Sequence, residues 1–358
     1  IGTAFQKTGV RWIEKKGFRA ILADAQGTGK TIQAISLIGR NNEALVPVLV
    51  ICPSSVVWNW ERELKRWLSG VSVAVIEAQS TMLDRGHVSV CSWDMMNLKH
   101  DELMSVDWQF IIADEAHYVK NPLSKRSEAF SELAFKCPHL LLMTGTPLVN
   151  NEMEFDVLQA YVDGDQTPIL RRILEDVDKS VPNKNRIQVA VEMPPDIRRE
   201  YIEIKDQFEF FIESYLRRVE GVDADLTERL ESLSQAQCLA KLTYLRRLLG
   251  RCKVPSVAEW AEKMVNKGES VVIFGEHKDV LDMLCDALSQ LRLKHLRYDG
   301  ATSRMNRQIA IDSFQLGKIP ILVCSKSACE GITLTKSANL AFLELYWTPA
   351  STEQAEDR

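Results

Sequence analysis

The chain has 358 residues, of which 46% are apolar, and its formal net charge is −5 at pH 7. This length exceeds one ordinary domain and predicts two domains of roughly 150 residues each. No apolar run reaches the about 18 residues that a membrane span requires, and no secretory leader is visible. The eight cysteines are scattered without a C-x-x-C pair, a pattern typical of a reducing, intracellular protein with neither zinc site nor disulfide framework.

Short apolar runs typical of buried parallel strands alternate with helix-period stretches along the chain. The first group is RAILAD, PVLVIC, VSVAVI, HVSVC, QFIIAD and HLLLMTG; the second is SVVIF, LKHLRY, IPILVC and LAFLEL. A mostly helical stretch at about 195–250 separates the two groups. The fold class is therefore predicted to be α/β, with lobe 1 at 1–165, a short helical connector at 166–252 and lobe 2 at 253–358.

The stretch LADAQGTGKTIQA contains a glycine-rich phosphate loop in which Asp24 stands where the first glycine is usual. The loop follows a predicted strand and opens a predicted helix, so the helix N-terminus would face an anionic phosphate. In such a loop Lys30 would meet the β- and γ-phosphates and Thr31 would meet Mg²⁺. A chance match is the alternative, but the placement between strand and helix favours an altered, intact nucleotide site.

The segment QFIIADEAHYVK ends a strand in two carboxylates, Asp114 and Glu115. A carboxylate at the carboxyl end of a parallel strand lies at the ligand-binding edge of the sheet. We expect Asp114 to hold Mg²⁺ and Glu115 to orient or deprotonate the attacking water, the two roles that phosphoryl transfer needs. The alternative is that both acids only cap a helix N-terminus.

A third segment, LLLMTGTPLVN, places Thr144-Gly145-Thr146-Pro147 after a strand. Alone it would be an ordinary turn, but after G-x-G-K-T and D-E-A-H it matches the third helicase motif. With these three ordered motifs the chain resembles a superfamily 2 helicase and, within that superfamily, the SNF2 family.

The SNF2 resemblance accounts for the unusual phosphate loop, because that family writes it D-x-x-G-x-G-K-T and Asp24 is then expected. Its members more often have Glu, Met and Leu where this chain has Ala25, Gln26 and Thr28. The resemblance implies two RecA-like lobes, ATP as the nucleotide, and Mg²⁺ held by Thr31 and Asp114. The nucleotide-contacting positions that it implies are Gln6, Gly27, Thr28, Gly29, Lys30, Thr31 and Gly331.

Further segments extend the resemblance over nearly the whole chain. FQKTGVRWI is similar to the adenine-reading motif, ICPSSVVWNWERELKRW to motif Ia and VCSWDMM to motif Ib. In lobe 2, VVIFGEH resembles motif IV, YDGATSRMNR the next DNA-contacting segment, SKSACEGITLTKSANLAFLELYWTP motif V, and EQAEDR the start of motif VI. The DNA-contacting positions implied in this way are Ser54, Ser55, Ser92, Thr144, Thr146, Thr302, Ser303 and Thr335.

The same resemblance implies that neither lobe carries a complete catalytic site. Arg358 matches the first motif VI arginine, a finger that stabilises the charge of the transferring phosphoryl group. His117 and Gln354 would couple the nucleotide to movement, with the lobes closing on ATP and reopening after hydrolysis. The family's second finger arginine would follow Arg358, and a chain without it is expected to hydrolyse slowly. Motif V departs from the family at Glu330, for which a surface carboxylate is the simplest interpretation.

Several other side chains have structural and functional interpretations. Trp60, Leu64 and Trp67 share one helical face, which is more typical of core packing than of base stacking. A basic cluster could contact phosphates or complement the C-terminal dipole of a long helix, and neither reading is preferred. The cluster comprises Arg246, Arg247, Arg251 and Lys253. Arg171 and Arg172 match a family segment leaving lobe 1 and are expected to brace the two lobes.

The substrate expected from the resemblance is branched DNA. LLGRCKVPSVAEW, VIFGEHKDVLDML and LELYWTPASTEQAEDR look most like the annealing-helicase, fork-remodelling branch of the family. We therefore expect a monomeric DNA translocase without membrane contact, held to forked or branched DNA through its phosphates. It would be cytoplasmic or nucleoid-associated if bacterial or phage, and nuclear if eukaryotic.

Three alternatives stay open. The first is a DEAH-type RNA helicase, the second a chromatin-type DNA translocase, and the third an ATP-dependent clamp without turnover. ATPase rates with RNA and with DNA would separate the RNA helicase from the others.

Overall fold

The computed structural model describes residues 2–79, 87–145, 152–162, 167–173, 177, 184–219, 224–328, 334–347 and 349–357. The chain divides into two compact units. Unit 1 comprises Ile1–Lys184 with Glu330–Ile332 and Glu356–Arg358, and unit 2 comprises Asn185–Cys329 and Thr333–Ala355. Most of the helical connector expected at 166–252 falls within unit 2, and the boundaries inferred from sequence remain predictions.

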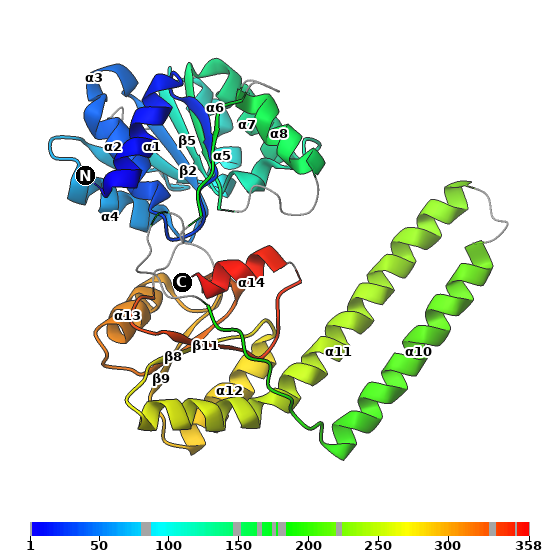
Figure 1. The fold of residues 1–358 in the computed structure, drawn as a ribbon. Coiled ribbons are helices and arrows are strands. Elements are labelled where there is room, and N and C mark those ends of the chain that lie inside the picture. Colours follow the sequence, from blue (N-terminus) through cyan, green and yellow to red (C-terminus); the bar gives the residue numbers. More distant parts are fainter. Residues whose placement is uncertain are drawn as a thin grey trace. The chain divides into compact units, whose positions relative to one another are not determined.

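Unit 1, which contains β2 and β5 of Figure 1, is built on one sheet. The strand order of this sheet is β3-β4-β2-β5-β6-β1-β7. Every strand pair in it is parallel. The strands are β1 Arg19–Leu22, β2 Val48–Cys52, β3 Val73–Val75, β4 Val88–Ser92, β5 Phe110–Asp114, β6 His139–Met143 and β7 Ile169–Leu170. The first six coincide with the apolar runs predicted from sequence, whereas β7 was not predicted.

Helices cover both faces of this sheet. One face carries α1 (Ala4–Lys15), α2 (Lys30–Arg40) and α4 (Val57–Trp67), whose apolar side chains share a core cluster with alternate strand residues. The other face carries α5 (Trp93–Leu98), α7 (Lys125–Lys136) and α8 (Glu152–Val162). The shorter helices are α3 Asn42–Leu45, α6 His100–Met104 and η1 Ala116–Val119. Because both faces are covered, the strands are mostly apolar, with Ser89 as a buried polar exception within β4.

Unit 2 has a smaller parallel sheet with strand order β11-β8-β10-β9. Its strands are β8 Val271–Phe274, β9 His295–Tyr298, β10 Ile321–Cys324 and β11 Asn339–Phe342. Its shorter helices are α12 Lys278–Gln290, α13 Arg304–Gln315, η3 Lys326–Ala328 and α14 Pro349–Glu356. The prediction of an α/β fold with two parallel-sheet lobes is confirmed.

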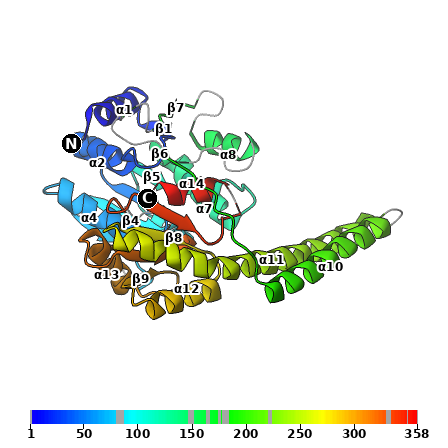
Figure 2. The same ribbon diagram turned by 60° about the horizontal axis from the view of Figure 1, so that its bottom comes forward.

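Two long helices extend from the unit 2 sheet. Helices α10 (Pro195–Val219) and α11 (Ala224–Asn266) lie side by side in both views (Figures 1 and 2). The C-terminal part of α11 packs on the sheet through Val254, Ala258 and Ala261, which share a core cluster with α12. None of the described helices is long and apolar enough to cross a bilayer.

Candidate functional site

The loop between β1 and α2 depends on two glycines with left-handed backbone. Gly27 has φ 77° and Gly29 has φ 78°, a region that glycine enters without steric cost. A side chain at Gly29 would also displace Gln6, because its Cβ would lie 2.3 Å from Gln6 Nε2. Helix α2 begins directly after Gly29, with Lys30 and the half-buried Thr31 in its first turn. The loop therefore leads into a helix N-terminus, whose first N–H groups have no acceptor within the helix and face the side from which an anion would bind.

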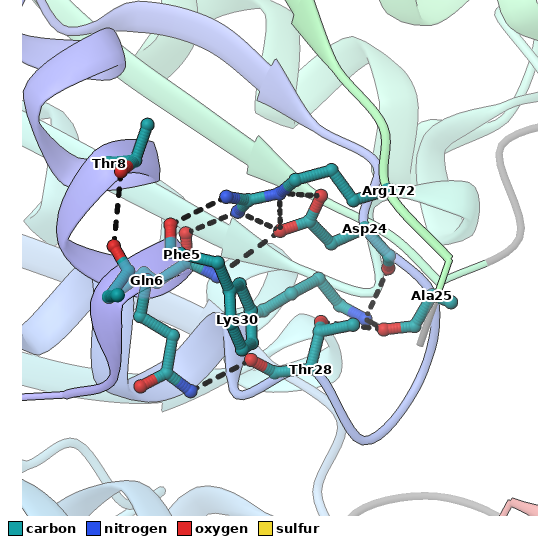
Figure 3. A network of polar contacts seen from close by, with 10 residues as sticks. Phe5, Gln6, Thr8, Asp24, Ala25, Thr28, Lys30 and Arg172 are labelled. Atoms are coloured by element: carbon teal, nitrogen blue, oxygen red, sulfur yellow. Dashed lines mark hydrogen bonds and ion pairs between the residues drawn. The ribbon is translucent and has the colours of Figure 1, made fainter. Parts of the chain in front are cut away.

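The side chains of Lys30 and Gln6 hold the loop from two sides (Figure 3). Lys30 Nζ donates to the carbonyl oxygens of Asp24, at 2.9 Å, and Ala25, at 3.3 Å. Gln6 Nε2 donates to the Thr28 carbonyl at 2.9 Å, and the Thr28 hydroxyl donates to the Ala25 carbonyl at 2.7 Å. The loop thus keeps an ammonium group beside the start of a helix, the arrangement expected for a phosphate site.

Asp24 is fully buried beneath this loop. Arg172 Nε donates to both carboxylate oxygens, at 3.0 and 3.2 Å, and Arg172 Nη2 donates to Oδ2 (Figure 3). Gln33 Nε2 donates to Oδ2 at 3.2 Å, while the Arg172 guanidinium also reaches the Phe5 carbonyl and Gln33 Oε1. The acid that replaces the usual first glycine is therefore an anchor. These partners of Arg172 all lie in unit 1, and the role of Arg171 and Arg172 in bracing the two lobes stays a prediction.

Asp114 ends β5, is half-buried and accepts hydrogen bonds from two indoles. Trp60 Nε1 donates to Asp114 Oδ2 at 2.8 Å, and Trp93 Nε1 donates to the Asp114 carbonyl at 3.0 Å. Burial and the neighbouring Glu115 charge raise the pKa of Asp114 to about 6, against the lowering effects of the Trp60 hydrogen bond and the Lys30 ammonium. Asp114 therefore lies within the electrostatic reach of the phosphate loop.

Glu115 follows in a left-handed conformation, with φ 51°. It is 8% exposed, and its Oε2 lies 3.3 Å from His117 Nδ1. Although Glu115 is the N-cap residue of η1, its side chain makes no capping hydrogen bond. The structure therefore does not support the alternative in which Glu115 serves as a helix cap.

The segment after β6 completes this edge of the sheet. The Thr144 N–H donates to the Leu22 carbonyl at 3.2 Å, and a Cβ at Gly145 would lie 3.3 Å from Lys30 Nζ. Thr144 is fully buried, which does not support the predicted direct contact with DNA. Thr146 lies outside the described residues.

The other unit 1 positions predicted to contact DNA also follow strand ends. Ser54 is exposed and Ser55 half-buried in the turn between β2 and α4. Ser92 caps α5, its Oγ accepting from the Met95 N–H at 3.1 Å. Ser54 is the most accessible of the three, and the roles of all three in DNA binding stay predictions.

In unit 2 the predicted residues lie in a turn, two helices and a loop. Thr302 Oγ1 donates to Asp299 Oδ1 at 2.8 Å, and Ser303 is the N-cap of α13. Thr335 is exposed, whereas Gln354 in α14 is 8% exposed. Gly331, Glu330 and Arg358 lie outside the described residues, so their predicted roles are not tested.

The basic cluster of α11 is paired with groups inside unit 2. Arg246 Nη2 lies 2.5 Å from Glu276 Oε2, and its guanidinium stacks over the Trp347 ring. Arg247 and Arg251 both bind Asp279, at 2.7 and 2.8 Å. Lys253 Nζ donates to the Leu343 carbonyl at 2.8 Å. Neither sequence interpretation describes this arrangement: the cluster joins α11 to the sheet and α12.

Trp60 is the site residue whose contact was not predicted. Together with Leu64 it was assigned to the core, and both are buried, at 1% and 0% exposed. Trp67, on the same predicted face, is 38% exposed. The indole N–H of Trp60 nevertheless donates to the Asp114 carboxylate. The sequence held one indication of this contact: Trp60 lies in a motif segment, and a buried indole N–H requires an acceptor.

A glycine-rich loop and an acidic strand end at one edge of a parallel sheet, accompanied by a second parallel-sheet unit, define a helicase-type nucleotide-binding protein. The SNF2-related domain model matches residues 5–166, and the helicase conserved C-terminal domain model matches residues 241–358. The chain belongs to the SNF2 family of superfamily 2.

Several proteins are similar to this chain over nearly its whole length. The SWI/SNF-related matrix-associated actin-dependent regulator of chromatin subfamily A-like protein 1 of Xenopus tropicalis is 29% identical, over 99% of this chain and 40% of that protein. The ISWI chromatin-remodeling complex ATPase ISW1 of Saccharomyces cerevisiae is 27% identical, over 99% of this chain and 37% of that protein. The chain thus spans about two-fifths of these relatives.

Among solved structures, the Hef helicase domain of Pyrococcus furiosus superposes with a TM-score of 0.62. It is 13% identical, and the match covers 100% of this chain and 92% of that one. At this identity the likeness supports the fold alone, which is that of a two-lobed helicase core.

Proposed function

We propose that this chain is a DNA-dependent ATPase that couples ATP hydrolysis to movement on DNA and to the remodelling of branched DNA. One observation carries the proposal. The Lys30 ammonium is held at the start of α2, at the same sheet edge as the Asp114 carboxylate. A cation for phosphate and an anion for Mg²⁺ are the pair that ATP hydrolysis requires.

The residues of the loop fit ATP and Mg²⁺. The left-handed Gly27 and Gly29 leave the backbone N–H groups open to an anion, and Gln6 lies against the loop where an adenine edge would be read. Thr31 and Asp114 supply the oxygen ligands that Mg²⁺ prefers. Bound Mg²⁺ would neutralise the charge developing on the phosphates.

The proposed chemistry of the chain itself rests on Glu115 and Lys30. Lys30 exchanges the carbonyl oxygens of Asp24 and Ala25 for phosphate oxygens, which are stronger acceptors because they are charged. Glu115, directly after β5, orients or deprotonates the attacking water. His117, which lies beside Glu115, couples the nucleotide state of the site to the binding of nucleic acid. Arg358 would complete the site as a finger.

DNA as the track is supported by family membership and by the exposed Ser54 after β2. Branched DNA is supported by the lobe 2 segments described above. A second candidate, a chromatin-type translocase, is favoured by relatives whose names include a chromatin-remodeling complex ATPase. Either function would place the chain where the cell keeps its DNA.

The first test compares ATPase rates without nucleic acid and with single-stranded DNA, duplex, forked DNA, nucleosomes and RNA. We expect DNA to stimulate turnover, with forked DNA most effective. Greatest stimulation by nucleosomes would favour the chromatin-type alternative, and stimulation by RNA alone would make the chain an RNA helicase. ATP-dependent DNA binding without any turnover would make it a clamp.

Lys30→Ala should abolish turnover, because it removes the cation that faces the β- and γ-phosphates, while DNA binding persists. Lys16→Ala, at an exposed position after α1, is the matched control and should be normal. Normal turnover of Lys30→Ala, measured as phosphate release, would contradict the phosphate-loop assignment.

Glu115→Gln should bind ATP but hydrolyse it at least about 100-fold more slowly, the scale of lost help from a general base. Single-turnover rates with ATP pre-bound separate this effect from weakened binding. If the rate is unimpaired, Glu115 has no part in the chemistry.

A further inference from the structure

Gln26 is a buried amide in the phosphate loop that lacks a partner. Its side chain is 6% exposed, and neither Nε2 nor Oε1 has a hydrogen-bond partner in the described part of the chain. Burying an amide without hydrogen bonds is unfavourable, so such groups are rare in folded proteins and call for an explanation. A ligand that supplies the missing partner is one explanation that can be tested.

The contrast with Gln33 shows that this unit can satisfy a buried glutamine. Gln33 is fully buried on α2, yet its Nε2 donates to Asp24 and its Oε1 accepts from Arg172. The two glutamines lie seven positions apart in the sequence. The unpaired state of Gln26 is therefore specific to its position.

That position is beside the Lys30 ammonium. A Cβ built on Gly145 would lie 3.2 Å from Gln26 Nε2 and 3.3 Å from Lys30 Nζ, so both nitrogens border the same point. The same Cβ would lie 2.7 Å from Gln26 Cγ, so glycine at 145 is what lets the Gln26 side chain lie beside Lys30. An amide nitrogen and an ammonium are both hydrogen-bond donors, and two donors so close together suit an anion.

We propose that Gln26 Nε2 donates a hydrogen bond to the terminal phosphate of the bound nucleotide and so helps the site to distinguish ATP from ADP. This inference rests on the proposed ATPase function. Lys30 would serve the β- and γ-phosphates together, whereas Gln26 serves the γ-phosphate alone. ADP lacks the γ-phosphate, so the hydrogen bond from Gln26 would form with ATP but not with ADP. The contribution of Gln26 should therefore appear in the ratio of the ATP affinity to the ADP affinity.

The test is Gln26→Met, which keeps nearly the same volume but removes the amide. Two readouts should move in opposite directions. The melting temperature of the nucleotide-free protein should rise by about 2–4 °C, because an unsatisfied buried group is gone. The ratio of ATP to ADP affinity, measured by calorimetry with Mg²⁺, should fall about tenfold to hundredfold, the range of a hydrogen bond to a charged group.

Matched variants separate this result from simple damage. Gln33→Met makes the same chemical change at a partnered amide and should lower the melting temperature. Gln26→Asn keeps an amide and should retain part of the ATP preference, whereas Gln26→Glu should weaken ATP more than ADP by charge repulsion. If Gln26→Met does not fold, these last two variants decide the matter.

An unchanged ATP to ADP ratio in Gln26→Met or, if that variant does not fold, in Gln26→Glu would overturn the inference while leaving the ATPase proposal intact. A wild-type protein that binds neither nucleotide would overturn both. A lower ratio without the gain in melting temperature still supports the phosphate contact, because stability and selectivity are measured separately.

Discussion

The Trp60 side chain combines a packing role and a polar role in one residue. Its ring is 1% exposed within the cluster that α4 forms with the sheet. Its Nε1 donates to the carboxylate of Asp114, the proposed Mg²⁺ ligand. This bond lowers the pKa of Asp114, whereas burial and the Glu115 charge raise it. Trp60 is therefore a positioning residue that also keeps the ligand ionised.

Trp60→Phe should retain most of the packing but lose the donor. Without it the pKa of Asp114 rises further, so more of the carboxyl is protonated at a given pH and Mg²⁺ binds less well. We expect the Mg²⁺ concentration for half-maximal ATPase to rise about threefold to tenfold, the value of one hydrogen bond. The acid side of the pH–rate profile should move to higher pH.

Trp67→Phe is the matched control, because the Trp67 indole N–H binds the half-buried Glu63, away from Asp114. It should leave the Mg²⁺ dependence unchanged. An equal shift in both variants would mean that the effect comes from helix packing and not from the bond to Asp114.

Sequence reasoning at the residue scale located the acids but not what holds them. The strand end QFIIAD placed Asp114 at the sheet edge, and periodicity placed Trp60 in the core. Periodicity reports which side of a helix is buried, but it does not report where a buried N–H points. The contact of Asp24 with Arg172 could not be predicted either, because Arg172 lies 148 positions after Asp24 in the sequence.

At the scale of elements, Arg172 joins segments that are distant in sequence. It follows β7 and binds the loop acid Asp24, the α2 residue Gln33 and the carbonyl of Phe5 in α1. The Arg172 side chain is 16% exposed and the Asp24 side chain 0%. Removing one member of such a pair leaves the other charge buried without compensation.

Arg172→Met should therefore destabilise unit 1 by about 3–5 kcal/mol, the usual cost of breaking a buried ion pair. Chemical denaturation followed by fluorescence would measure this change. Arg171→Met, at the exposed neighbouring position, should change stability by less than about 0.5 kcal/mol. Equal effects of the two substitutions would contradict the anchoring role.

The limits of prediction at this scale have physical causes. The strand β7 has two residues, too few for any period to appear, and it is defined by its pairing with β1. Helix α11 runs through the predicted boundary at 252/253. Its N-terminal part packs against α10 and its C-terminal part packs on the sheet, so one continuous helix has two different surroundings. A pattern averaged over such a helix shows no single apolar face.

At the scale of the whole molecule, the net charge and the pairing of basic residues limit which surface can bind DNA phosphates. The net charge is −5, and Arg246, Arg247 and Arg251 of α11 pair with acids within unit 2. We therefore expect DNA to meet a local surface to which hydroxyl and N–H groups contribute. Such contacts bind phosphate without reading bases.

We expect DNA affinity to fall as the salt concentration rises. On duplex DNA the logarithm of the affinity should fall against the logarithm of the salt concentration with a slope of about 0.9 per phosphate neutralised. Ser54→Ala should weaken binding equally on unrelated sequences and leave the slope unchanged, because a hydroxyl releases no counterion. Ser69→Ala, at an exposed serine in the turn after α4, is the control. Fluorescence anisotropy at several salt concentrations gives the affinity and its salt dependence. A strong preference for one duplex sequence would indicate base readout instead.

The bond between Asp24 and Arg172 also has a consequence for synthesis on the ribosome. Strand β1 pairs with β6 and β7, and the loop that it carries is anchored by a residue translated 148 positions later. At about 5–20 residues per second this interval lasts roughly 7–30 s. Throughout it a nascent chain carries the phosphate-loop sequence without the contact that shapes it. We therefore expect nucleotide to bind only after Arg172 has been synthesised and has paired with Asp24.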